Sequence, residues 1–153
     1  MTEETAFSKS YLLFHDKIER TEWYLSLIES NIDDEQRMRY ILNHLMTDRG
    51  QWNMARNLIL KYGLIPYSAM PDPFHQKSLI DLNVSISNML KFYALHLKKK
   101  PSASEKDSMK SIIMNTVKRM LVHLLGEPPT EISAPDIFQC KNKISPQSFF
   151  MTT

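Results

Sequence analysis

Apolar residues recur at helical spacing along most of this chain, and prolines, glycines or polar clusters interrupt the pattern. Such periodicity is typical of amphipathic helices. Only three glycines occur in 153 residues, which is few for a sheet-rich domain with tight turns. We therefore predict one mainly α domain over residues 1–153, with about five helices. The expected helices cover residues 8–31, 33–47, 52–62, 77–98 and 104–125.

The first expected helix carries a seven-residue apolar repeat. Its members alternate spacings of three and four residues, with Thr21 in the remaining slot: Tyr11, Phe14, Ile18, Leu25 and Ile28. This pattern has two interpretations, a coiled-coil face for a partner or a stripe that faces the core. Because the repeat lasts only about three heptads, we favour the core-facing stripe.

The second expected helix begins at three adjacent carboxylates, Asp33, Asp34 and Glu35. Acidic side chains are favourable at a helix start, where the macrodipole is positive. They could also suggest a metal site, but no glycine or second ligand cluster follows at calcium-loop spacing. We favour a solvated first turn. The buried face of this helix is predicted to hold Met38, Ile41, Leu42 and Leu45.

The fourth and fifth expected helices are long, amphipathic and joined by a short polar loop, which predicts an antiparallel pair. Ser104 is the expected N-cap of the fifth, with Asp107 three residues later. Lysines 98–100 could form a nucleic-acid or membrane patch, yet a solvated helix end explains them better. The predicted core positions are Leu79, Leu82, Ile86, Met89, Leu90, Tyr93, Leu97, Met109, Ile112, Ile113, Val117, Met120, Leu121 and Leu124.

The stretch from Asp48 to Pro71 reads as a turn, a short helix and an extended exit. Gly50 suits the turn, and Gly63 ends the helix. Two apolar stripes predict a helix buried on most of its circumference: Trp52, Ala55, Ile59 and Tyr62, with Met54 and Leu58. Pro66 favours extended backbone before it, so residues 64–70 are expected to form an orphaned strand.

The same stretch resembles the aminopeptidase C and bleomycin hydrolase family of papain-like cysteine peptidases. The similar motifs are GQW-x-M at residues 50–54, KYGLIP at 61–66 and SAMP at 68–71. FSKSYLLFHDKIER at residues 7–20 is similar to the family's LSQSYLxFWDKxER, with His15 at the tryptophan position. LLGEPP at residues 124–129 is similar to LGxPP. The resemblance implies an internal piece of an α+β papain-like fold.

The resemblance also implies which parts of the enzyme this segment holds. In the family the nucleophilic cysteine precedes the LSQSY-like stretch, and the catalytic histidine and asparagine follow the LGxPP-like stretch. No residue here is therefore assigned a catalytic role. The implied substrate-binding residues are Gly50, Gln51 and Trp52 on one wall of the cleft. Arg49 replaces the family's first cleft glycine and Asn53 replaces its aspartate; an arginine there would crowd the backbone.

Charge and composition exclude several other functions. A formal net charge of +2 does not by itself favour nucleic acid or an anionic membrane as a partner. The acidic start MTEETAF is unlike a signal peptide, and no apolar run approaches the length of a membrane span. The five histidines lack metal-site spacing, so we expect neither a metal nor another cofactor.

Cys140 is the only thiol in the sequence. One cysteine cannot form an internal disulfide, which fits the cytoplasmic location that the family resemblance implies. A nucleophilic thiolate needs a helix N-terminus, a histidine or a cationic pocket. Lys141 and Lys143 are near, but no histidine is close in sequence. We favour an inert thiol.

These observations leave two functional hypotheses. The first is a truncated or split cysteine aminopeptidase, inactive alone, whose partners are the missing peptidase segments and whose peptide substrate binds only after complementation. The second is a non-catalytic helical protein that docks onto a full-length homologue. Under either hypothesis, helices that have lost their packing partners would expose apolar surface, so we expect self-association.

Overall fold

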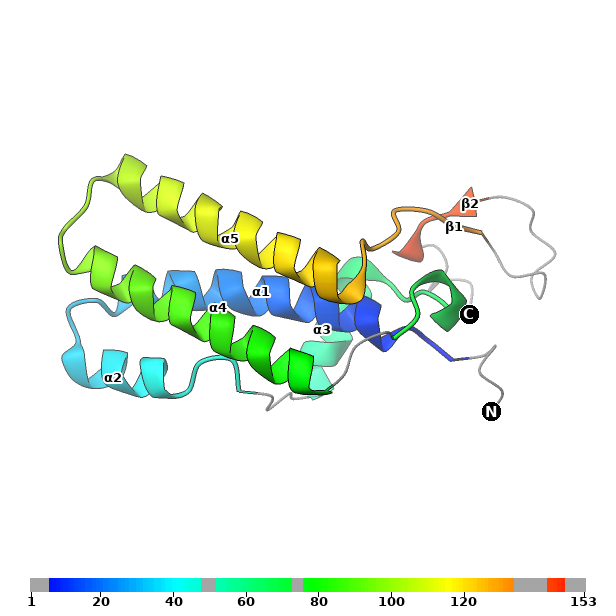
Figure 1. The fold of residues 1–153 in the computed structure, drawn as a ribbon, viewed down its shortest axis with the longest axis horizontal. Coiled ribbons are helices and arrows are strands. Elements are labelled where there is room, and N and C mark those ends of the chain that lie inside the picture. Colours follow the sequence, from blue (N-terminus) through cyan, green and yellow to red (C-terminus); the bar gives the residue numbers. More distant parts are fainter. Residues whose placement is uncertain (1–5, 48–51, 73–75, 134–142, 148–153) are drawn as a thin grey trace. The chain divides into compact units, whose positions relative to one another are not determined.

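The computed structural model describes residues 6–47, 52–72, 76–133 and 143–147 (Figure 1). The mainly α prediction is confirmed in these ranges by five α-helices: α1 Lys9–Ser30, α2 Glu35–Asn43, α3 Trp52–Tyr62, α4 Gln76–Leu97 and α5 Ala103–Leu125. A 3-10 turn, η2, covers Tyr67–Ala69. Beyond the last helix, β1 (Ile132–Ser133) pairs antiparallel with β2 (Lys143–Ile144).

The chain divides into two compact units, each built from separated stretches. Unit 1 contains residues 1–16, 49–73 and 121–153, and unit 2 contains residues 17–48 and 74–120. Helices α1 and α5 are therefore each divided between the two units. That residues 1–153 form a single domain stays a prediction.

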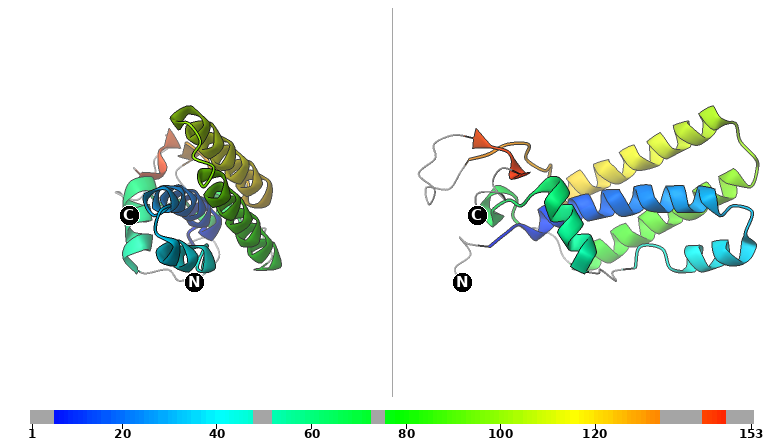
Figure 2. Two further views of the ribbon diagram at one scale, coloured as in Figure 1. Left: turned by 90° about the vertical axis from the view of Figure 1, so that its left-hand side faces the viewer. Right: turned by 180° about the vertical axis from the view of Figure 1, so that it is seen from behind.

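Unit 2 is a helical bundle in which α4 and α5 run antiparallel and side by side, as their amphipathic patterns predict (Figures 1 and 2). Its core is the face that the sequence predicted on three helices. The fully buried members are Thr21, Ile28, Ile86, Leu90, Tyr93 and Val117. On α1 the stripe differs at one position, because Lys17 is buried and Ile18 is only partly so.

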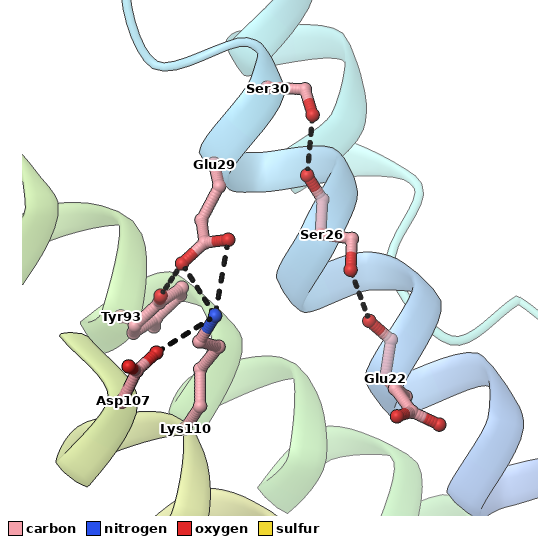
Figure 3. A network of polar contacts seen from close by, with 7 residues as sticks. All are labelled: Glu22, Ser26, Glu29, Ser30, Tyr93, Asp107 and Lys110. Carbon is pink, nitrogen blue, oxygen red and sulfur yellow. Dashed lines mark hydrogen bonds and ion pairs between the residues drawn. The ribbon is translucent and has the colours of Figure 1, made fainter. Parts of the chain in front are cut away.

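A polar cluster joins three helices of this unit (Figure 3). The hydroxyl of Tyr93 on α4 donates a 2.5 Å hydrogen bond to the Glu29 carboxylate on α1. The ammonium of Lys110 on α5 lies 3.1 Å from the same carboxylate and 3.5 Å from Asp107. Burial, and then the hydrogen bond to Glu29, raises the pKa of Tyr93. The hydrogen bond that the Lys110 ammonium donates to Glu29 raises the pKa of Lys110. Glu29 therefore links α1 to both long helices.

Helix α2 begins as the sequence predicts and ends earlier. Asp34 is the N-cap, and its carboxylate accepts a 2.9 Å hydrogen bond from the backbone N–H of Arg37. The acidic first turn is exposed, as a solvated turn should be. The helix ends at Asn43, its C-cap His44 is no longer helical (φ −121°), and Met46 then has a positive φ of 51°. Leu42, expected in the core, is only partly buried.

The N-cap of α5 is Ser102, so the prediction of Ser104 was wrong by two positions. The Ser102 hydroxyl donates to Glu105 (2.9 Å) and accepts from the Glu105 backbone N–H (3.3 Å). Glu105 in turn accepts from the Ser102 backbone N–H at 2.7 Å. This reciprocal pair is a capping box. The hydrogen bonds from Ser102 lower the pKa of Glu105.

Replacing Ser102 with alanine should therefore destabilise unit 2 by about 1 kcal/mol, whereas Ser104→Ala should have little effect. Because the pKa of Glu105 is lowered on folding, the contribution of the capping box should be complete above the unfolded pKa and disappear as the pH falls. Urea unfolding of both variants at neutral and acidic pH measures this. Equal destabilisation by the two substitutions would contradict the assignment of the cap.

Some positions on the two long helices differ from the predicted core. Ile112 is 58% exposed, and its neighbours in the prediction are only partly buried at Leu79, Met89, Met109, Met120 and Leu124, whereas Leu125 is buried. Residues on the border of an amphipathic stripe can face either way, and the neighbouring helices decide. Of the helices that the structure describes, none is long and apolar enough to cross a membrane.

Candidate substrate-binding segment

The residues proposed from the sequence to bind substrate lie around the start of α3. Gly50 and Gln51 fall outside the described residues, as do Arg49 and Cys140. Trp52 is the first residue of α3, and its side chain is 78% exposed. A tryptophan this accessible offers a large apolar surface to a ligand or a partner. The assignment of the three binding residues stays a prediction.

The prediction that α3 is buried on most of its circumference was wrong. No residue of this helix is buried, and Leu60 and Met54 are 54% and 38% exposed. The apolar stripes predicted from the sequence exist, but the described part of the chain covers them only in part: Ala55, Leu58, Ile59 and Tyr62 are partly buried, and Trp52 and Met54 are exposed. Helical periodicity shows which residues share a face and does not show what packs against it. The exposed apolar side chains therefore form a surface without a partner in the described residues.

The segment that follows α3 is firmly held within unit 1. The Gly63 N–H donates to the carbonyl of Ile59 (2.8 Å) with a φ of +82°, which closes the helix as predicted. The next residues are not an orphaned strand, because Pro66 forms an isolated antiparallel bridge with Phe7. The extended backbone then stops at η2, so the strand prediction for residues 64–70 was correct only for its first half.

Two buried serines tie the start of α1 to this segment. The Ser8 hydroxyl donates to the Met70 carbonyl (2.5 Å) and accepts from the Tyr11 N–H (3.1 Å), so it acts as the N-cap of α1. The N–H and hydroxyl of Ser10 both donate to the Asp72 carboxylate, at 2.9 and 2.8 Å. A carboxylate is favourable at a helix N-terminus. A serine before an apolar repeat is a known N-cap signal. Nothing in the sequence indicated that the distant Asp72 would accept hydrogen bonds from Ser10.

An aromatic cluster fixes α3 against the first part of α1. The imidazole of His15 stacks on the ring of Tyr62 at 3.9 Å and meets Tyr11 edge-on at 4.7 Å. The Tyr11 hydroxyl donates to the Tyr62 carbonyl (2.8 Å). Burial, followed by the neighbouring Tyr62, raises the pKa of Tyr11 to about 12. Histidine at the family's tryptophan position therefore keeps an aromatic contact with α3.

The end of the described chain also packs against α3. The backbone of Pro146 and Gln147 passes directly over Gly63, and the side-chain amide of Gln147 donates to the carbonyl of Lys61. That carbonyl lies in the last turn of α3, where backbone acceptors lack helical partners. The close approach at Gly63 had no sequence signal, because the two segments are far apart in the chain.

The residues that the structure describes contain no assembled catalytic site. Among them no group of three or more His, Cys, Asp and Glu side chains could hold a metal ion. The tyrosine and histidine of the aromatic cluster are engaged in packing. What the geometry provides is a rigid support for α3 and an exposed apolar surface on it.

Comparison with known proteins agrees with the motif resemblance. Residues 1–152 match the model of the Peptidase C1-like family. The chain is 32% identical to aminopeptidase C of Listeria monocytogenes over 157 residues, covering 94% of this chain and 34% of that protein. It is 27% identical to bleomycin hydrolase of Homo sapiens over 136 residues, covering 83% and 30%.

The fold is similar to part of a solved peptidase structure. The crystal structure of PepW from Lactobacillus rhamnosis matches with a TM-score of 0.78 and 29% identity, over 94% of this chain and 35% of that one. The chain thus spans about a third of the length of the relatives that it matches. The agreement of motifs, sequence model and fold shows that this chain belongs to the Peptidase C1-like family.

Proposed function

We propose that these 153 residues are the internal helical segment of a papain-like cysteine aminopeptidase, and that they do not hydrolyse peptides alone. Their relatives are aminopeptidases and a bleomycin hydrolase, of which the match covers about a third. The segment would contribute one wall of a peptide-binding cleft through Gly50, Gln51 and Trp52. The cysteine, histidine and asparagine of the reaction would come from other segments.

The observation that carries this proposal is the state of α3. A helix with no buried residue, and with a tryptophan that is 78% exposed at its start, would be a poor element in a self-sufficient domain. Unit 1 nevertheless holds α3 in place through the His15–Tyr62 stack and the strand-like bridge at Pro66. A rigidly held helix with uncovered apolar side chains is what an interface to further peptidase segments requires.

The single cysteine supports our placing the protein in the cytoplasm, because a chain with one thiol needs no oxidising compartment to form an internal disulfide.

An aminopeptidase assay tests the proposal. The pure chain should release no amino acid from a chromogenic aminoacyl substrate, and Cys140→Ser should change nothing. Mixing the chain with the segments of Listeria monocytogenes aminopeptidase C that flank the matched region should restore activity that a thiol-blocking reagent abolishes. Arg49→Gly should increase the restored activity, because glycine permits the close backbone approach that an arginine side chain hinders.

Substituting the proposed cleft wall supplies the matched comparison. Trp52→Ala should lower restored activity, whereas Trp23→Ala, also an exposed tryptophan but on α1, should not. Hydrolysis by the pure chain that is lost in Cys140→Ser would overturn the proposal. So would equal restored activity in the two tryptophan variants, since the cleft wall would then lie elsewhere.

A second candidate function is docking onto an intact homologue without catalysis. The same exposed side chains of α3, Trp52, Met54 and Leu60, favour it. Co-purification with a full-length peptidase, without restored activity in the mixing experiment, would support this candidate over the first. The docking should be weakened by Leu60→Asp, which places a charge in the apolar contact.

A further inference from the structure

We draw no further inference here: the strongest candidate, the exposed apolar face of α4 beside the hollow that Phe92 and Ile112 line between α4 and α5, is an unpartnered surface, and nothing in the described part of the chain shows what covers it.

Discussion

Replacing Gly63 with alanine is expected to destabilise unit 1 by about 2 to 4 kcal/mol, among the largest single-residue effects in this protein. Two costs add. The φ of +82° is unfavourable for any residue with a Cβ. An alanine Cβ would also overlap the backbone carbonyl of Pro146, so one of the two segments would have to move. Backbone cannot yield as the end of a flexible side chain can.

Gly126 provides a matched control for that experiment. It also ends a helix with a positive φ, +93°, but a Cβ there would meet no atom within 4 Å. Gly126→Ala should therefore show only the conformational cost, about 1 kcal/mol. Denaturant unfolding followed by circular dichroism measures the difference between the two variants. If they were equally destabilised, the packing of Pro146 over Gly63 would not contribute to stability.

Replacing Glu29 with alanine is expected to destabilise unit 2 by about 2 to 3 kcal/mol. The substitution leaves the buried Tyr93 hydroxyl without its acceptor and removes the carboxylate next to Lys110. Most of the loss should come from the hydroxyl, because Lys110 and Glu29 are 33% and 29% exposed and water screens their attraction. The three-helix connection seen in Figure 3 would be lost.

Glu22→Ala is the control, because Glu22 is an exposed glutamate on the same helix whose backbone carbonyl, not its carboxylate, accepts from Ser26. It should change stability by less than about 0.5 kcal/mol. Folding raises the pKa of both Tyr93 and Lys110. Their contribution should thus be complete at neutral pH and decline as the pH rises above about 10. This alkaline loss should be smaller in Glu29→Ala; an unchanged profile would contradict the role of the carboxylate.

The local signals in the sequence were reliable where a short stretch decides the outcome alone. Helical periodicity located all five helices, and the acidic cluster around Asp34 and the glycine Gly63 marked two of their ends. The capping of α5 shows the limit of such local signals, which did not distinguish between two nearby serines. Ser102 and Ser104 are both good caps, and the glutamate three residues after Ser102 completes the reciprocal pair that Ser104 lacks.

The candidate site was predictable only in part, because its properties depend on residues distant in sequence. The motifs around Trp52 indicated the family, and the family model and fold agree. The exposure of α3 could not be derived, since its apolar stripes look the same whether or not another segment covers them. The attachment of Ser10 to Asp72 and of Pro146 to Gly63 likewise joins residues more than sixty positions apart.

The sequence by itself therefore determined the helices, most of their ends and the family to which the chain belongs. These properties follow from the backbone preferences and spacing of neighbouring residues. Only the tertiary structure decided which apolar faces are covered. It showed that most of the predicted face of α4 packs inside unit 2, while Trp52 and Leu60 on α3 and Phe92 on α4 remain exposed. The physical reason is that burial requires a second surface, and periodicity along one helix carries no information about that surface.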